Sequence, residues 1–311
     1  MGISCLIFGI ALAVGFFIAS GMKITRYYEK SFYKNGGIDL MEDQYVQAMT
    51  IAGSDSDGSA GMQADMHTFF TRNVYGVSVM TACVAGNSYG IGASVTLPTD
   101  FIDKEFELIA KDFQIRAAKT GMLADSKLIE TVVKNYQKYD FGPLVVDPVI
   151  VTKHGNLLLE ESALQSLKEK LVPLAEVLTP NFYEAEKLTG RTLAAEEDFV
   201  QAAKELQDMG AKNVMIKGHH AKNAQQETVN DYVLFESGKS FWLNAPFYPT
   251  DRINGTGDSL SACIAAELAK GKTVEQAIRL AKDYVNRAIR EEINVGHKYG
   301  PINHWAAGEL E

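Results

Sequence analysis

The sequence predicts an α/β protein built on a mainly parallel β-sheet that is covered by helices on both faces. Its 311 residues are 46% hydrophobic and 22% charged, which suits one large core or two modest domains. Strand-like runs alternate with segments of helical periodicity along most of the chain. The run at 144–146 is continuously apolar, as expected for a strand buried on both faces of a parallel sheet.

The first α/β unit is predicted at residues 46–70. A strand at 46–51 leads into a loop at 52–61 that is rich in glycine and carboxylates. This loop lacks the GK[ST] of a P-loop and does not match GxGxxG, and its carboxylates would repel a phosphate. It therefore suits an uncharged polar ligand, or it is a solvated loop. The helix that follows is expected to place on one face Met62, Met66, Phe69 and Phe70.

The other elements follow from the same two periodicities. Further strands are expected at 77–84, 115–119, 144–146, 176–178 and 213–216, with an antiparallel hairpin of 231–236 and 240–243 at the sheet edge. Helices are expected at 101–113, near 125–139, from 181, at 196–209, after 258 and at 273–290. The apolar stripe of the last helix indicates core packing rather than a cofactor site.

The composition excludes several classes of function. The formal net charge is −9 and the sequence pI is about 5.3, without a long basic run, so no nucleic-acid partner is expected. Three cysteines lie far apart and form no CxxC pair, which argues against a disulfide framework or a zinc site. This cysteine usage makes a reducing cytoplasm the default location, with a membrane tether kept as the alternative.

Residues 1–44 form an amino-terminal extension with two open interpretations, ahead of a predicted catalytic domain at 45–311. The run 3–20 is apolar and uncharged, close to the lower length limit for a membrane-spanning helix. The run is followed by Lys23, Arg26, Lys30 and Lys34, which would leave the domain facing the cytoplasm. The alternative is that the extension is not part of the working protein, with Met41 as a natural start.

The stretch Asn254-Gly255-Thr256-Gly257-Asp258 precedes an apolar helical pattern. Glycines allow backbone N–H groups to converge, and the helix dipole adds positive potential at that end. This is an anion site with a carboxylate beside it, which suits transfer of a phosphoryl group to an alcohol. The alternative is a glycine turn with an aspartate near a helix cap.

Other polar residues also follow predicted strands. Asp147 comes directly after the run at 144–146, where ligands collect in parallel sheets, so it marks either a magnesium site or a turn. Asn181 and Glu184 share the first turn of a helix and form either a site or a cap. Lys217 follows the strand at 213–216 and is a candidate phosphate contact.

Together these motifs resemble the hydroxymethylpyrimidine/phosphomethylpyrimidine kinase family of the ribokinase-like superfamily, which is close to pyridoxal/pyridoxine kinases. The resemblance spans about 46–305. It rests on TIAGSDSDGSAGMQAD (50–65), NVYGVSVMTA (73–82), AAKTGML (117–123), VVDPV (145–149), LTPNFYEAEKLTG (178–190), VMIKGHH (214–220), NGTGDSLSACIAAELAKG (254–271) and VGHKYGPINHW (295–305).

The resemblance implies a three-layer α/β/α fold and transfer of the ATP γ-phosphate to a hydroxymethyl group on a small heteroaromatic ring. Asn181 and Lys217 would bind phosphate, and Mg²⁺ would lie near Glu184 and Asp147. Asp258 would be the general base. The resemblance also places the substrate ring near Ala60, Asp65, Gly86, Met122 and Val149, and the anion hole at Gly255, Thr256 and Gly257.

Two positions depart from the usual family pattern. The family typically has cysteine where this chain has Asp258, whereas the wider superfamily uses aspartate there. Gly86 stands where pyrimidine kinases usually carry a glutamine that binds the ring edge. The carboxyl-terminal VGHKYGP run favours the pyrimidine branch, so the expected substrate is 4-amino-5-hydroxymethyl-2-methylpyrimidine, with its monophosphate as a second acceptor. Gly86 and Asp258 leave a pyridoxine, pyridoxal or pyridoxamine kinase open as the alternative. A more remote alternative is a membrane-tethered ligand sensor without turnover. By analogy we expect a homodimer.

Overall fold

One mixed β-sheet organises the part of the chain that the structure describes, residues 45–150, 159, 161–218 and 227–308 of a computed structural model. Within those residues the sheet has nine strands in the order β3-β2-β1-β4-β5-β6-β7-β8-β9. The strands are β1 (Gln47–Asp55), β2 (Tyr75–Asn87), β3 (Gly90–Thr96), β4 (Ile115–Thr120), β5 (Leu144–Val146), β6 (Ala175–Leu178), β7 (Asn213–Ile216), β8 (Thr228–Leu234) and β9 (Ser240–Pro246). Neighbours from β2 to β7 run parallel, while the pairs β2–β3, β7–β8 and β8–β9 are antiparallel.

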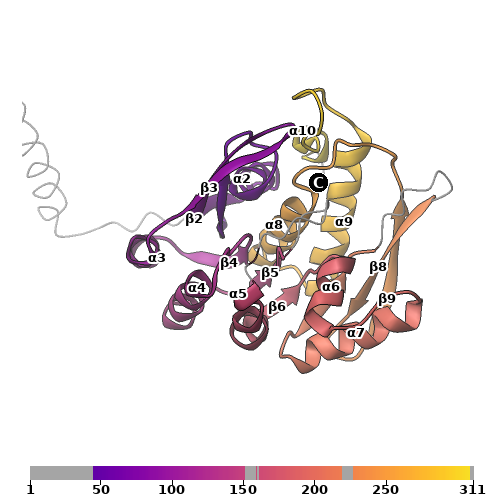
Figure 1. Cartoon of the computed structure of the whole chain (residues 1–311), viewed down its shortest axis with the longest axis horizontal. Coiled ribbons are helices and arrows are strands. Elements are labelled where there is room, and N and C mark those ends of the chain that lie inside the picture. Colours follow the sequence, from indigo (N-terminus) through magenta and orange to yellow (C-terminus); the bar gives the residue numbers. More distant parts are fainter. Residues whose placement is uncertain (1–44, 151–158, 160, 219–226, 309–311) are drawn as a thin grey trace, which may run out of the picture. The chain divides into compact units, whose positions relative to one another are not determined.

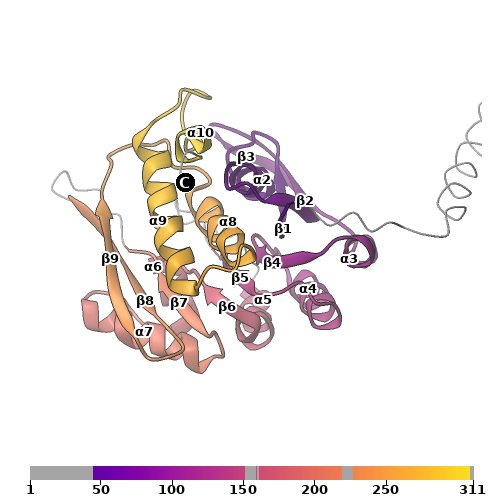
Figure 2. The ribbon, with the colours of Figure 1, turned by 180° about the vertical axis from the view of Figure 1, so that it is seen from behind.

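Helices cover both faces of the sheet. They are α2 (Gly61–Thr71), α3 (Thr99–Asp112), α4 (Ser126–Lys138), α5 (Glu161–Ser166), α6 (Phe182–Thr189), α7 (Glu196–Asp208), α8 (Thr256–Ala269), α9 (Val274–Arg290) and α10 (His304–Ala307), with short turns of other helix types at Leu167–Leu171 and Val172–Leu174. In Figure 1 the row α3, α4, α5 and α7 lies on one side, and Figure 2 shows α2, α8 and α9 on the other. The predicted three-layer α/β/α fold with a mainly parallel sheet is confirmed.

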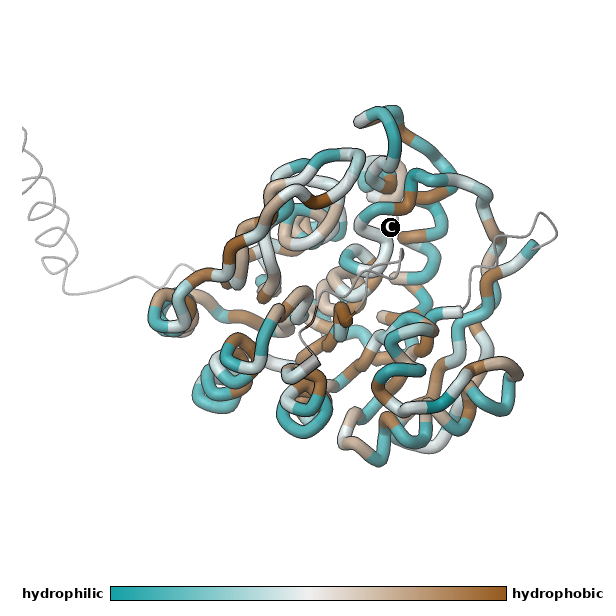
Figure 3. The backbone as a smooth tube through the Cα atoms, viewed as in Figure 1, coloured by the Kyte–Doolittle hydropathy of each residue, from teal (hydrophilic) through white to brown (hydrophobic). Residues whose placement is uncertain are grey.

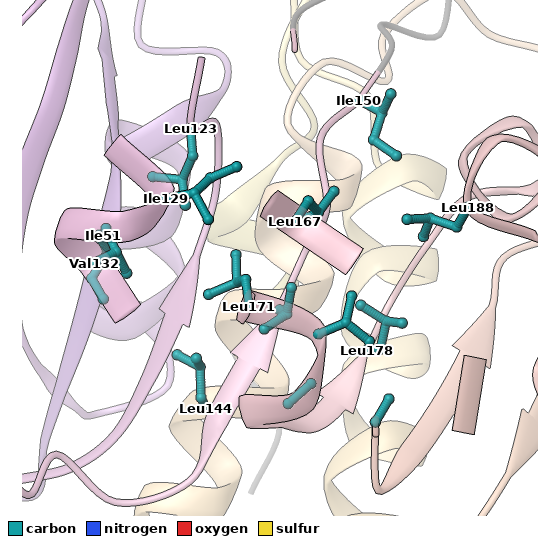
Figure 4. Packing of buried hydrophobic residues seen from close by; sticks show 14 of the residues in the cluster. Ile51, Leu123, Ile129, Val132, Leu144, Ile150, Leu167, Leu171, Leu178 and Leu188 are labelled. Carbon is teal, nitrogen blue, oxygen red and sulfur yellow. The ribbon is translucent and has the colours of Figure 1, made fainter. Parts of the chain in front are cut away.

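Two hydrophobic cores fill the spaces between the layers, because alternate residues of each buried strand face opposite sides. In β5, Leu144 and Val146 join the core under α4 and α5, whereas Val145 joins the core under α8 and α9. Figure 4 shows the first of these cores from close by, with Leu144 among its labelled side chains. Figure 3 shows the hydrophobic colour concentrated in the central strands and the hydrophilic colour on the outer turns of the helices.

The structure extends or corrects several sequence-based expectations. The hairpin at the sheet edge is confirmed as β8 and β9. The second strand does not end at 84, because β2 continues to Asn87 and pairs with β3, which the sequence analysis missed. Every residue of β3 is exposed, so the strand lacks the apolar alternation that identifies a buried strand. The helices α5 and α10 were also missed.

The expected apolar face of α2 is partly wrong. Phe69 is fully buried in the core under α8, whereas Phe70 is 81% exposed. Adjacent residues differ by about 100° around a helix, so the two rings cannot both point at the sheet. Among the described residues no helix is both long and apolar enough to cross a membrane, and the expectations for residues 1–44 lie outside them.

Phe69 and Phe70 give a matched test of this orientation. We expect Phe69→Ala to lower the free energy of unfolding by about 3–5 kcal/mol, because it removes a buried ring and leaves a cavity. Phe70→Ala should change it by less than about 0.5 kcal/mol, since that ring lies in solvent. Urea unfolding of both variants measures the difference, and equal losses would contradict the assigned face of α2.

Candidate active site

Three parallel strands each have a charged side chain at the carboxyl edge of the sheet, on the same face as buried apolar residues of the strand. Lys119, Asp147 and Lys217 each lie two residues beyond an apolar residue that faces α8. Those apolar residues are Ala117, Val145 and Met215. Because residues i and i+2 of a strand point to the same face, the charges lie on the α8 side. This edge is where ligands bind in open α/β sheets.

The amino terminus of α8 is held against the loop that follows β1. Gly255 has a φ of +78°, and a Cβ there would overlap the carbonyl oxygen of Ser59. The amide of Asn254 donates to the Ser59 hydroxyl at 3.3 Å. Among the described residues no side chain caps α8, so the first-turn N–H groups at Gly257 and Asp258 are available to an anion. The N–H of Thr256 instead donates to the carbonyl oxygen of Ile253 at 3.4 Å, so the open N–H groups lie at Gly257 and Asp258 rather than throughout the expected anion hole at 255–257.

A buried ion pair lies directly beneath this helix terminus. Lys119 Nζ is 3.0 Å from both carboxylate oxygens of Asp65, and Thr50 donates to the same carboxylate at 2.6 Å. The Lys119 ammonium is also 3.7 Å from Oδ1 of Asp258. The side chains of Lys119 and Asp65 are fully buried, whereas that of Asp258 is 20% exposed. Only Asp258 of these three therefore opens toward a ligand.

The pKa shifts of the buried pair reflect its surroundings. Burial raises the pKa of Asp65 to about 7, against the attraction of Lys119. Burial disfavours the ammonium form of Lys119, but Asp65, Asp258 and Asp147 together raise its pKa above the ordinary value. Lys119 therefore stays charged. The sequence analysis did not single out Lys119, although a lysine after the apolar pair Ala117-Ala118 in a predicted buried strand is a usable signal.

The second lysine meets a carboxylate beside Gly257. Lys217 Nζ lies 3.4 Å from Oδ1 of Asp147. A Cβ added at Gly257 would stand 3.5 Å from Oδ2 of Asp147 and 3.5 Å from Lys217 Nζ. The structure therefore brings together the three residues that the sequence assigned to metal, phosphate and anion hole. A glycine at this position leaves room for a ligand atom between the helix backbone and the charged pair.

Glu184 organises the backbone around this pair. It forms a capping box with Asn181: the Asn181 side chain accepts from the Glu184 N–H at 2.9 Å, and the Glu184 carboxylate accepts from the Asn181 N–H at 2.8 Å. Its other carboxylate oxygen accepts from the N–H of Ile150 at 3.0 Å. Burial raises the pKa of Glu184 to about 7, opposed by Lys217. Both interpretations of this motif, cap and site, are thus compatible.

These residues also bear on Mg²⁺. Within the described residues no cluster of three or more metal-binding side chains is present. Magnesium does not need one, because it commonly binds one or two carboxylates together with water and substrate phosphates. Oδ2 of Asp147 faces Gly257 and is the better placed oxygen, whereas both oxygens of Glu184 already accept backbone N–H groups. The donor set therefore fits Mg²⁺ bound mainly through Asp147.

The expected ring-binding residues lie in separate loops at the same edge. Gly86 donates its N–H to the Ser56 hydroxyl at 2.9 Å, and that hydroxyl donates back to the Gly86 carbonyl at 3.0 Å. This exchange ties the end of β2 to the loop after β1. Ala60, at the start of α2, donates its N–H to Asp55 at 3.1 Å. Burial, followed by repulsion from Asp57, raises the pKa of Asp55 to about 6.

Three further ring candidates differ in access. The methyl group of Met122 lies against Gly53, where an added Cβ would be 3.1 Å away. Val149 has a φ of +42°, an uncommon conformation for a β-branched residue, and the next N–H is the one held by Glu184. Asp65 has no exposed surface and both of its oxygens are engaged by Thr50 and Lys119, so its side chain is not open to a ligand.

His304, which the sequence analysis did not select, supports the first turn of α8 from behind. Its Nε2 lies 2.9 Å from the hydroxyl of Ser259, the residue after Asp258, and its ring packs edge-on against His67 at 5.3 Å between centroids. Burial, with a smaller contribution from His67, lowers the pKa of His304 to about 4. The ring is therefore neutral near pH 7.

Open N–H groups, a proton acceptor and two lysines at one sheet edge are what a phosphotransferase needs to act on a small alcohol. The fold and the site thus define a small-molecule kinase of the ribokinase-like class. A family model described as phosphomethylpyrimidine kinase matches residues 55–303. The chain belongs to this family.

Individual relatives agree with this assignment. The chain is 46% identical over 264 residues to the hydroxymethylpyrimidine/phosphomethylpyrimidine kinase of Haemophilus influenzae, covering 85% of this chain and 98% of the relative. Among solved structures, an ADP complex of Bacillus subtilis pyridoxal kinase superposes with a TM-score of 0.78 at 36% identity, covering 86% of this chain and 100% of that one. Staphylococcus aureus pyridoxal kinase in complex with AMP-PCP and pyridoxal gives a TM-score of 0.77 at 31% identity, covering 86% and 97%.

Gly255 and Gly271 provide a matched test of the contact between α8 and the loop after β1. Both have a positive φ, but a Cβ at Gly271 meets nothing within 4 Å. We expect Gly271→Ala to cost about 1 kcal/mol of stability without loss of activity. Gly255→Ala should destabilise more and lower kcat/KM by at least about 100-fold, because Ser59 and the helix terminus must separate. Similar kinetics for the two variants would contradict this constraint.

His304 should make stability depend on pH. Its folded pKa of about 4 lies below the ordinary 6.5, so the unfolded state binds the proton better. The stabilisation is complete above about pH 6.5 and is lost as the pH falls toward about 4, which amounts to about 2 kcal/mol between about pH 7.5 and pH 5. We expect His304→Asn to remove about 2 kcal/mol from the difference in unfolding free energy between about pH 7.5 and pH 5, measured by urea unfolding at both pH values. An unchanged slope in the variant would count against a buried neutral ring.

Proposed function

We propose that this chain is an ATP- and Mg²⁺-dependent kinase that phosphorylates the hydroxymethyl group of 4-amino-5-hydroxymethyl-2-methylpyrimidine in thiamine biosynthesis, and that it also accepts the resulting monophosphate. The observation that carries the proposal is the position of Gly257 at the start of α8, between Asp258 and the pair Asp147–Lys217. The name of the Haemophilus influenzae relative supports the choice of substrate.

The proposed reaction is an in-line transfer. The substrate hydroxyl gives its proton to Asp258 while its oxygen attacks the γ-phosphorus of ATP, and the bond to the bridging oxygen breaks so that ADP leaves. The first-turn N–H groups of α8 at Gly257 and Asp258 and the ammonium of Lys217 stabilise the negative charge of the migrating group, and Gly255 and Thr256 form the turn that presents these N–H groups. The backbone of Asn181 forms a parallel β-bridge with that of Lys217, and we assign Asn181 to phosphate binding beside it.

Asp147 and Glu184 are the residues that would hold Mg²⁺. When bound, the metal neutralises charge on the triphosphate. Glu184 contributes by fixing the backbone at Asn181 and Ile150 rather than by a free oxygen. Asp147 also lies 3.4 Å from the ammonium of Lys217, which places a countercharge beside its carboxylate.

A pyridoxal-type kinase activity is the second candidate. Gly86 removes the side-chain amide that would bind a pyrimidine edge, and the space beside it is bounded by backbone, with Gly90 O 3.2 Å from an added Cβ. The Staphylococcus aureus structure contains pyridoxal, and its fold matches this chain closely. The ring would lie near Ala60, Met122 and Val149 in either case.

We further propose that the working unit is the domain at 45–311 and that it acts as a homodimer in the cytoplasm. The family relationship supports the domain and the homodimer, and the small polar substrate supports the location. We expect no nucleic-acid partner. The relative from Haemophilus influenzae matches over 98% of its own length while leaving part of this chain unmatched.

The test is ATP turnover on two acceptors. We expect the protein to phosphorylate hydroxymethylpyrimidine with a higher kcat/KM than pyridoxal, measured as ADP release and by product mass. A higher kcat/KM for pyridoxal would replace the leading substrate by the second candidate. No turnover on either acceptor would remove the kinase proposal and favour a ligand sensor.

Asp258→Asn is the matched blank for these assays. The amide keeps the size of the side chain but cannot accept the hydroxyl proton, so we expect kcat to fall by about 10²- to 10⁴-fold. Binding of ADP, measured by calorimetry, should change little. Wild-type turnover in this variant would exclude Asp258 as the base.

A further inference from the structure

We propose that Lys119 is a positioning residue that holds the Asp258 carboxylate in place for catalysis, with Asp65 as its buried anchor. The inference rests on the proposed role of Asp258 as the base. It assigns to Lys119 and Asp65 a shared function that neither would have as a direct ligand contact, since both side chains are fully buried.

The geometry gives Lys119 a fixed direction. Two contacts of 3.0 Å to Asp65 and the Thr50 hydroxyl bond to the same carboxylate hold the pair from the side of α2 and β1. The free side of the ammonium points toward Asp258 on α8, at 3.7 Å. These contacts therefore link the buried pair Asp65–Lys119 to the partly exposed carboxylate of Asp258. A lysine with no exposed surface cannot swing away to another partner.

Charge explains why Asp258 needs such a partner. In the proposed reaction this carboxylate stands beside an anion site, so a bound phosphate repels it. Lys119 supplies the opposite charge from within the protein, where screening by water is weak. The other charged or titratable groups around the helix terminus are Asp147, Lys217 and, behind Ser259, His304. Among the described residues, Lys119 is the one whose charged group lies within ion-pair distance of the Asp258 carboxylate.

A purely structural role must be distinguished from positioning. The pair Asp65–Lys119 also ties α2 to the sheet, so its loss would lower stability in either case. The chain offers a matched pair: Arg72, at the end of α2, contacts Glu267 of α8 at 2.7 Å with both side chains buried. Figures 1 and 2 show α2 beside α8. This second pair also anchors α2 through a buried charge pair, but it joins α2 to α8 rather than to the sheet, and Glu267 lies at the far end of α8 from Asp258.

The experiment uses the full chain and a double-mutant cycle. The test variant is Lys119→Met with Asp65→Asn, which removes both buried charges together. The control is Arg72→Met with Glu267→Gln. Each is also made in the Asp258→Asn background. Phosphoryl transfer from radiolabelled ATP is measured in single turnover, which remains measurable when steady-state turnover is lost. KM for ATP and Tm are recorded for every variant.

We expect the test variant to lower kcat by about 10- to 100-fold with KM for ATP within about threefold, because Asp258 loses its orientation and countercharge. In the Asp258→Asn background the same change should lower the rate by less than about twofold, since Lys119 acts through that carboxylate. The control pair should lower Tm but leave kcat within about twofold in both backgrounds.

Two results would overturn the proposal. One is an undiminished kcat in the test variant. The other is an equal fractional loss in both backgrounds, which would mean that Lys119 acts independently of Asp258. If the test variant does not fold, Lys119→Gln, which can still donate to Asp65, takes its place with the same criteria. An active Asp258→Asn protein would instead remove the proposed base, and this outcome is separate from the behaviour of Lys119.

Discussion

The site depends on the alternation of side chains along a strand, because alternate residues face the same layer. Through this alternation, three parallel strands place charged side chains beside the amino terminus of α8. The rows that face this helix are apolar inside the sheet and end in Lys119, Asp147 and Lys217 at its carboxyl edge. Gly255 lets α8 begin directly over them, because the backbone turns there against Ser59. The site is therefore the polar end of a packed core, where low polarity strengthens each electrostatic contact.

The balance of charge at this edge bears on the proposed Mg²⁺ site. Four carboxylates and two lysines meet there, namely Asp65, Asp147, Glu184, Asp258, Lys119 and Lys217. Burial raises the pKa of Asp65 and of Glu184 to about 7, so the edge is less negative near pH 7 than this count of side chains implies. Two of the carboxylates are satisfied internally, by an ammonium or by backbone N–H groups. Binding a triphosphate without a cation would add repulsion that helix N–H groups alone do not offset.

Local patterns predicted most of the fold and several site residues. The capping box at Asn181 and Glu184 lies within four residues, and Asp147 follows a continuous apolar strand, so both could be identified from the sequence. The role of Lys119 could not, because its partner Asp65 lies 54 residues away and a single lysine in a strand has many possible environments. The exposed strand β3 was missed for the opposite reason, since no buried face constrains its sequence.

The residue at 258 and the residue at 86 constrain different parts of the reaction. A carboxylate at 258 changes the charge next to the anion site but not the backbone that forms it, because Gly255 and Ser59 set the start of α8. A substitution at 258 would therefore leave the backbone of the proposed anion site in place. Gly86 lies instead at the end of β2, tied to Ser56. Because separate contacts support these two positions, we expect the proposed base at 258 and the proposed ring contact at Gly86 to vary independently of each other.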